Sequence, residues 1–459
     1  MLTQKRLPYY LKIDTMKKLI LFHSFLITLA LLNFSHAQQT TAIVDYLAPK
    51  AITLNTPAEL NPLIEEAGKR KLVLLGEASH GTLEYYEWRA EISKRLIVEH
   101  GFSFIAVEGD WASLYRLNKY VKDLPGAPES AVEAMKNFSR WPGWMWGNTT
   151  VAGLIEWMRE YNSKLSAEEK VGFYGMDVYG QWEAMDDLLA YAELYFPEHF
   201  ETIAEKLACF ERFDRDEWAY ARATASSNFS CEDELNALVG LIAELGRKVG
   251  VDKKNEHFRA KQNALVVKNA EDYFRLAVRG GSPSWNSRAE HMWFSVKRLF
   301  NFYGQNSRGI IWAHNTHVGD ARATTMASHG MVNIGSLSRQ ELGGDNVFIT
   351  GFGTYRGMVN AGSQWGSPMQ IMNVPKAHNE SIEFALNQVG EPAFLLLFDE
   401  IDRAHSLFGQ YIGHRAIGVV YNPLNETGNY VPTYFTRRYD SFIFINITNA
   451  LKPVKHKGL

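Results

Sequence analysis

Short apolar runs alternate with amphipathic stretches along much of the chain. Residues 71–75 form an apolar run, and residues 84–100 then carry apolar side chains at the i, i+4 and i+8 positions of one helical face. Gly101 ends this helix, and a second apolar run at 104–107 leads into a further helix from Asp110. The order of strand, helix and strand predicts a βαβ unit with parallel strands.

Further apolar runs extend the same pattern over the rest of the chain. We expect additional strands at 171–174, 309–313, 347–349, 394–398, 416–420 and 442–445. Residues from about 182 to 285 instead show long charged and apolar helical stretches without a strand pattern, which predicts a helical insertion or cap. The sequence therefore predicts an α/β fold, with a mostly parallel β-sheet flanked by helices and the insertion forming a cleft over the carboxyl ends of the strands.

Residues 1–37 are typical of an export signal. A lysine pair precedes an apolar run at 19–32, and small residues then mark a cleavage site after Ala37. The run is too short for a comfortable membrane span. We expect Met16 to be the true start, with an upstream extension before it, and residues 38–459 to form a single domain in the periplasm or the medium, without a stable membrane span.

Composition and charge narrow the class of partner. The sequence is 46% hydrophobic, and its formal net charge of -3 is spread without long runs of one sign. This balance offers no footprint for nucleic acid or an acidic membrane, so we expect a monomer that binds a small molecule. The two cysteines, Cys209 and Cys231, fit neither a zinc knuckle nor a catalytic thiol, so we expect structural cysteines, with a bridge between them left open.

Polar residues capable of catalysis follow four of the predicted strands. Because the carboxyl ends of parallel strands meet at one edge of a sheet, we expect these residues to converge there. They are Glu77 and His80 after the first strand, Glu108 and Asp110 after the second, Asp177 after the third, and His314 and His317 after the fourth. Each also has an ordinary structural alternative, since acids at such positions cap helices and histidines bond to backbone carbonyls.

These residue types suit the activation of water. A histidine can take a proton from water while a neighbouring carboxylate fixes its tautomer. Arg89 lies within the first helix and is expected either to pair Glu77 or Glu108, to orient an acyl oxygen, or to form only a surface ion pair. No Gly-x-Ser-x-Gly nucleophile elbow occurs in the sequence, so water is the expected nucleophile.

The same residues leave a metal site open as an alternative. Glu77-x-x-His80 and His314-x-x-His317 combine carboxylate and imidazole groups, which suit Zn, Mn or Fe. A bound divalent metal would acidify its water and replace the general base. Neither pair forms the His-Glu-x-x-His signature, so spacing alone does not decide between the two interpretations.

The motifs resemble those of the erythromycin esterase family. The matching stretches are Leu74-Leu-Gly-Glu-Ala-Ser-His-Gly81 followed by Glu84 and Arg89, Gly101-Phe with Glu108 downstream, Gly172-Phe-Tyr-Gly-Met-Asp177, and Trp312-Ala-His-Asn-Thr-His-Val318. Their order and spacing extend from about Leu54 to Thr448. One departure is Ala289, which follows Arg288 where an acidic residue is expected, and this leaves an ion pair at that position open.

The resemblance implies hydrolysis of the macrolactone ester of erythromycin-like antibiotics, and so their inactivation, without a metal cofactor. It implies that His80 is the base that activates water, with the other catalytic positions at Glu77, Glu108, Arg89, His314 and His317. We further expect substrate contacts from Asp110, Trp111, Asp177 and Arg288. The alternatives are a metal-dependent hydrolase of an envelope-derived ester or amide, and a binding protein without catalysis.

Overall fold

The computed structural model describes residues 38–136, 138, 140–227, 229–250 and 253–454, so the predicted export signal lies outside the described part of the chain. Within these residues one sheet has the strand order β1-β8-β11-β6-β2-β5-β3-β4, and β7 pairs with the second half of β6. The strands are β1 (Ile52–Thr53), β2 (Leu72–Leu75), β3 (Phe104–Asp110), β4 (Gly172–Asp177), β5 (Gly309–Trp312), β6 (Val347–Ala361), β7 (Gln370–Val374), β8 (Ala393–Leu397) and β11 (Ser441–Thr448).

The sheet is mostly parallel, as the sequence predicts. Neighbouring strands from β11 through β6, β2, β5 and β3 to β4 all run in the same direction. Strands β8, β1 and β7 are antiparallel to their partners. A separate antiparallel pair is formed by β9 (Ile412–Arg415) and β10 (Tyr430–Thr433). The α/β architecture is therefore confirmed; the apolar runs predicted β8 but not its antiparallel direction, and they did not predict β1 or β7.

The strand predicted at 416–420 is wrong. Strand β9 ends at Arg415, and within the predicted run Ile417 and Val420 form isolated bridges to Ser79 and Gly362. Ile417 is nevertheless buried, and its backbone N–H donates to the carbonyl of Ala78, which follows the end of β2. The apolar run therefore reflects a loop packed against the sheet, not a strand within it.

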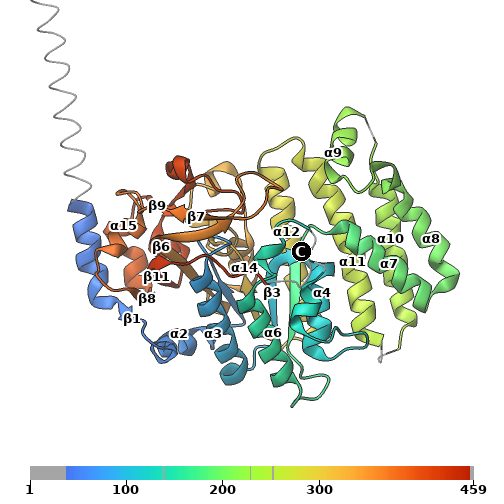
Figure 1. The fold of residues 1–459 in the computed structure, drawn as a ribbon, viewed down its shortest axis with the longest axis horizontal. Helices are drawn as coiled ribbons and strands as arrows, with labels where there is room; N and C mark the ends of the chain where they lie inside the picture. Colours follow the sequence, from blue (N-terminus) through green and yellow to red (C-terminus); the bar gives the residue numbers. More distant parts are fainter. Residues whose placement is uncertain (1–37, 137, 139, 228, 251–252, 455–459) are drawn as a thin grey trace, which may run out of the picture.

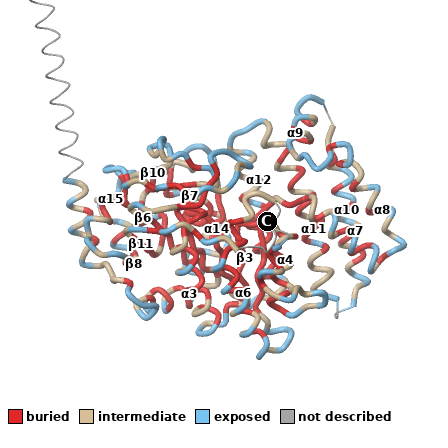
Figure 2. The backbone as a smooth tube through the Cα atoms, viewed as in Figure 1, coloured by how far each residue is buried: buried red, intermediate tan, exposed pale blue. Residues whose placement is uncertain are grey.

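Both faces of the sheet are covered, which explains the uninterrupted apolar strands. Along β2, Leu72 and Leu74 enter one core while Val73 and Leu75 enter the other. The buried strands form the centre of the molecule in Figure 2. The core that contains Leu72 and Leu74 is covered by α12 (Ser282–Tyr303), α14 (Ile334–Leu342), α15 (Ile382–Asn387) and α17 (Phe435–Arg438). The core that contains Val73 and Leu75 is covered by α2 (Asn61–Ala67), α3 (Leu83–His100), α5 (Ala131–Met135) and α6 (Thr149–Asn162). Helix α4 (Trp111–Lys122) contributes to both cores.

In its described part, the segment predicted as a helical insertion consists of helices joined by short turns, without a strand. It contains α7 (Gln181–Tyr195), α8 (Phe200–Leu207), α9 (Glu217–Ser226), α10 (Glu232–Leu245) and α11 (Lys254–Ala277). A disulfide joins Cys209, just after α8, to Cys231, just before α10. These helices stand beside the sheet, where α7 and α11 pack against α4 (Figure 1). None of the described helices has both the length and the hydropathy needed to span a membrane.

Candidate active site

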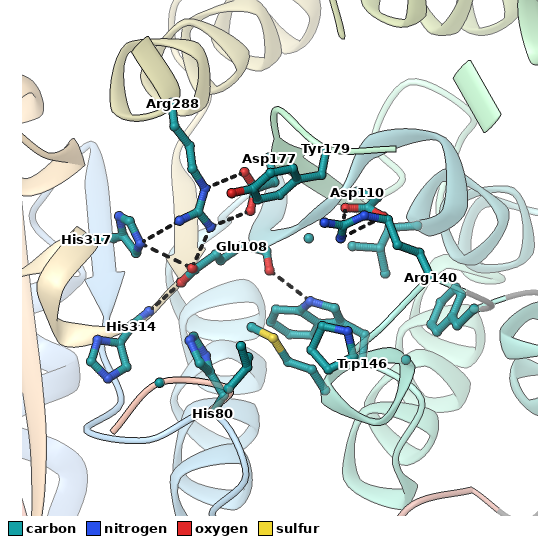
Figure 3. A pocket seen from close by; sticks show the side chains of 18 of the residues that line it. His80, Glu108, Asp110, Arg140, Trp146, Asp177, Tyr179, Arg288, His314 and His317 are labelled. Carbon is teal, nitrogen blue, oxygen red and sulfur yellow. Dashed lines mark hydrogen bonds and ion pairs between the residues drawn. The ribbon is translucent and has the colours of Figure 1, made fainter. Parts of the chain in front are cut away.

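A pocket of about 430 Å³ lies at the carboxyl ends of β2, β5, β3 and β4 (Figure 3). These four strands are parallel neighbours, so the residues that follow them meet at one edge of the sheet. The predicted site residues that line the pocket are His80, Glu108, Asp110, Asp177, Arg288, His314 and His317. Glu77 and Arg89 lie behind His80, where both are fully buried.

His80 is held in place by a buried carboxylate and a buried arginine. The Oε1 atom of Glu77 lies 2.8 Å from Nδ1 of His80, and its Oε2 accepts a bond of 2.6 Å from Nη2 of Arg89. The guanidinium of Arg89 also lies over the rings of Tyr86 and Trp312, 4.3 and 4.8 Å from their centres. An ionised carboxylate can only accept, so Nδ1 of His80 carries the ring proton and Nε2 is left as a base.

His80 and His314 have opposite protonation tendencies. Burial by itself lowers the pKa of His80, but the carboxylates of Glu108 and Glu77 outweigh it, so the pKa is raised above the usual 6.5. The ring of His314 lies 5.0 Å away, centre to centre. Burial first, and the neighbouring His80 second, hold the pKa of His314 well below its usual range. The pair therefore consists of one ring that accepts a proton and one that stays neutral.

His314 has a hydrogen-bond donor without a partner. Its Nδ1 accepts the backbone N–H of Thr316 at 3.2 Å, which makes His314 the N-cap of the short helix α13 (Asn315–Val318). Thr316 Oγ1 also lies 2.8 Å from this Nδ1, and with Nδ1 as the acceptor of both Thr316 groups we assign the proton of the neutral ring to Nε2. Within the described part of the chain this buried Nε2 has no hydrogen-bond partner. A donor in this position, in a residue that lines the pocket, can bind an oxygen of a substrate.

Arg288, from α12, connects the acids at the ends of β3 and β4. Its Nε and Nη2 donate to the two carboxylate oxygens of Asp177 at 2.8 and 2.7 Å, and Nη2 also reaches Glu108 Oε1 at 2.8 Å. His317 Nε2 lies 3.2 Å from both Arg288 Nη1 and Glu108 Oε1, and its ring stacks on Trp285. Against the effect of burial, His317, His80 and Arg288 hold the pKa of Glu108 well below its usual range, and Arg288 lowers the pKa of Asp177.

A bulge in β3 gives Glu108 its position. The register between β3 and β4 shifts between Val107 and Asp110, so β3 carries an extra residue there. A bulge of this kind redirects side chains and is common beside active sites. It depends on glycine, because a Cβ at Gly175 would lie 2.4 Å from the carbonyl oxygen of Gly109.

Asn315 joins the two loops that carry the histidines. Its backbone N–H donates to the carbonyl of Glu77 at 2.8 Å, and its side-chain amide donates to the carbonyl of Phe352 at 2.7 Å. The same amide nitrogen lies 3.2 Å from Nε2 of His414, whose Nδ1 is bonded to Glu383. A second buried histidine–glutamate pair therefore supports the site from behind, outside the pocket.

The far side of the pocket was not predicted from the sequence. Arg140 donates to Asp110 at 3.2 Å and lies 4.4 Å over the ring of Tyr179. Burial raises the pKa of Asp110 to about 6, although Arg140 acts against this shift. The remaining wall is mostly apolar, with Leu114, Phe138, Met145, Trp146, Trp365, Val419 and Val431. The cluster of three tryptophans at 141–146 was the sequence signal that could have indicated this wall.

Trp111 does not line the pocket, contrary to the expectation that it contacts substrate. It is 1% exposed and stacks on Tyr174 in the core, with ring centres 5.4 Å apart. Trp111 opens α4 directly after Asp110, and successive helical residues point about 100° apart. Asp110 and Leu114 face the pocket, so Trp111 faces the core.

The acids and histidines of the pocket do not fit a metal ion. Both oxygens of Glu77 are engaged by His80 and Arg89, and those of Glu108 are engaged by Arg288 and the backbone N–H of His314. Across the described ranges, no group of three His, Cys, Asp or Glu side chains is arranged to hold a metal. The negative charges of Glu77 and Glu108 are compensated by Arg89 and Arg288.

Comparison with known proteins adds a family and a fold. A family model described as erythromycin esterase matches residues 97–448, which leaves Glu77, His80 and Arg89 just before the match. Erythromycin esterase type II of Escherichia coli is 21% identical over 374 residues, covering 75% of this chain and 84% of that protein.

Three solved structures share the fold. A protein from Bacillus cereus has a TM-score of 0.71 at 18% identity, covering 91% of this chain and 99% of its own. A succinoglycan biosynthesis protein has a TM-score of 0.69 at 20% identity, covering 90% and 98%. A mutant of the erythromycin esterase EreC in its open conformation has a TM-score of 0.59 at 16% identity, covering 86% and 95%.

Proposed function

The chain belongs to the erythromycin esterase family, and we propose that it opens the macrolactone ester of erythromycin-like antibiotics by hydrolysis. Membership of the family indicates an esterase-type hydrolase. The observation that carries the finer proposal is the buried series Arg89–Glu77–His80, which ends at an Nε2 base in a residue that lines the pocket. The unused Nε2–H of His314 beside it supplies the second group that ester hydrolysis needs.

The proposed reaction uses water as the nucleophile. His80 Nε2 takes a proton from water, and the water oxygen attacks the carbonyl carbon of the lactone. The negative charge that forms on the carbonyl oxygen accepts a hydrogen bond from His314 Nε2–H. As the ester C–O bond breaks, protonated His80 returns its proton to the departing oxygen, which leaves a hydroxyl and a carboxylic acid on the opened ring, and the acid then loses its proton to the solvent as a carboxylate. Glu77 stabilises the imidazolium between these steps.

The pocket walls support a large apolar substrate. Leu114, Phe138, Met145, Trp146 and Trp365 give an apolar and aromatic side opposite the histidines. Such surfaces bind a macrolide ring through burial of apolar area, while a few polar groups orient the ester. Arg288 compensates the charge of Glu108 and Asp177, which supports a reaction without a metal cofactor.

We also propose that the protein is exported, to the periplasm or the medium, and acts as a monomer. The support for export is the signal pattern of residues 1–37. The Cys209–Cys231 disulfide is consistent with an oxidising compartment.

Mass spectrometry of erythromycin incubated with the mature protein tests the function. We expect the antibiotic to gain one water, with and without a chelator. His80→Asn should abolish the gain, while His329→Asn, which changes an exposed histidine outside the pocket, should keep it. Loss of activity to the chelator, restored by one divalent ion, would instead support a metal-dependent hydrolase. Wild-type turnover by a folded His80→Asn protein would refute the role of His80.

A further inference from the structure

A second cavity, of about 380 Å³, lies between α11 and α12 and is lined by basic side chains. Lys254, His257 and Lys261 come from α11, and Arg298 comes from α12. The two helices pack side by side (Figure 1). Among the described residues no carboxylate lines this cavity, and none of its lining residues belongs to the catalytic pocket.

Arg298 is partly buried without a described counter-ion. Its Nη1 makes a long bond of 3.3 Å to Oε1 of Gln262. Burial lowers the pKa of Arg298 to about 10, and no anionic neighbour acts against this shift in the described part of the chain. Removing a cation from water without a paired anion is costly, so a protein that keeps such a group normally uses it.

The surroundings of the cavity are positive as well. Burial and then Lys261 lower the pKa of His257. Nearby, burial and then Lys254 and Lys170 lower the pKa of Lys122 to about 8. The lowered pKa favours the neutral form of His257, so the excess of positive charge among the described lining residues comes from Lys254, Lys261 and Arg298.

Two carboxylates on α11 and the neighbouring α7 pair with an arginine that does not line the cavity. Glu256 is paired with Arg259, and Asp187 of α7 is bonded to the same arginine at 2.9 Å. Two aromatic rings complete the wall, since Phe258 and Phe302 line the cavity and stack on each other with centres 4.3 Å apart. The cavity therefore combines cationic groups with a flat apolar surface.

We propose that this cavity binds a small organic anion that carries a phosphate or sulfate group. Arg298, Lys254 and Lys261 would contact the anionic group, because guanidinium and ammonium groups are the usual partners of tetrahedral oxyanions. Phe258 and Phe302 would contact the remainder of the molecule. The site is distinct from the catalytic pocket and does not depend on the reaction proposed there.

Isothermal titration calorimetry on the full mature chain at low ionic strength tests the proposal. The probes are inorganic pyrophosphate, adenosine monophosphate and 4-nitrophenyl sulfate, which separate the phosphate from the sulfate class. We expect saturable binding of at least one probe. Arg298→Met and Lys261→Gln should each weaken it about 10- to 100-fold, the range for one hydrogen bond to a charged group.

A matched control and a stability measurement complete the test. Lys268→Gln removes a cation from the same helix, but Lys268 is paired with Asp272 outside the cavity, so binding should stay unchanged. The bound probe should raise the thermal unfolding midpoint of the wild type and not that of Arg298→Met. Without probe, Arg298→Met should unfold no earlier than the wild type. Absence of saturable binding by all three probes, or equal weakening by Lys268→Gln, would overturn the proposal.

Discussion

Glu77→Gln tests the buried series Arg89–Glu77–His80, because the substitution keeps the shape of the side chain and removes its charge. In the wild type Glu77 Oε1 lies 2.8 Å from His80 Nδ1, and Oε2 lies 2.6 Å from Arg89 Nη2. Arg89 can only donate, so the carbonyl oxygen of the Gln side chain would turn toward it. The amide NH2 would then face His80 Nδ1, and the ring proton would move to Nε2, where the base is needed.

The structure gives the size of the expected effect. A hydrogen bond to a charged group contributes about 1.5–3 kcal/mol, or about 10- to 100-fold in rate. The wrong tautomer adds to this loss, so kcat/KM for lactone hydrolysis should fall by about 10²- to 10⁴-fold. The assay measures the steady-state rate of erythromycin hydrolysis, with mass spectrometry as the method of detecting the product.

The pH profile supplies a second and independent signature. Glu77 is one of the carboxylates that raise the pKa of His80 above 6.5, and only the neutral ring can take a proton from water. Activity of the wild type should therefore rise with pH through this raised pKa. Without the charge of Glu77 the pKa of His80 falls, so the acid limb of kcat/KM should move to lower pH while the maximum falls.

Glu383→Gln is the matched control. Glu383 is also fully buried and bonded to Nδ1 of a histidine, His414, but neither residue lines the pocket. Glu77→Gln leaves Arg89 without its counter-charge, and Glu383→Gln weakens the buried acceptor of His414 Nδ1 and of the backbone N–H of Arg415, so both variants should lower the thermal unfolding midpoint. Only Glu77→Gln should displace the acid limb. An equal displacement in both variants, or wild-type kcat/KM in folded Glu77→Gln, would refute the reasoning.

Three further substitutions probe how the site is supported. In Gly76→Ala the new Cβ would lie 2.1 Å from Oδ1 of Asn315, so urea unfolding should show a loss of about 1–3 kcal/mol together with a lower kcat. Cys209→Ser opens a disulfide with a sequence separation of 22, which should cost roughly 3 kcal/mol in denaturant unfolding while kcat/KM stays unchanged. Trp285→Ala removes the ring that stacks on His317 at 4.7 Å, and a fall of about 2- to 10-fold in kcat/KM is expected from a loss of 0.5–1.5 kcal/mol. Wild-type stability in Gly76→Ala or Cys209→Ser, or wild-type kcat/KM in Trp285→Ala, would contradict the contact on which that prediction rests.

The edge of the sheet that carries the pocket could be predicted from the sequence because the relevant pattern is local. A buried parallel strand is a short apolar run, and the residue after it must lie at the carboxyl edge. This rule identified His80, Glu108, Asp177 and His314 without any knowledge of the strand order.

The other parts depend on contacts that the sequence pattern does not carry. Strand β7 alternates between exposed and buried positions, so it shows no apolar run. The direction of Trp111 is set by which face of α4 meets the pocket, and Arg140 reaches Asp110 only through the path of the loop before α6. Glu77, and not Glu108, is the partner of His80 Nδ1. This choice likewise depends on the packed positions of Arg89, which pairs with Glu77, and Arg288, which pairs with Glu108.

The arrangement of arginines supports the proposal that His80 acts as the base. Arg89 compensates Glu77 from behind the pocket, Arg140 compensates Asp110 at the far wall, and Arg288 is shared between Glu108 and Asp177. Four carboxylates therefore face three guanidinium groups, and one negative charge is left over. Glu108 and Glu77 raise the pKa of His80, while His314 stays neutral because its pKa is held well below its usual range. The excess charge stabilises the imidazolium that forms when His80 takes a proton from water, so the residues that hold the site together also favour the first step of the proposed reaction.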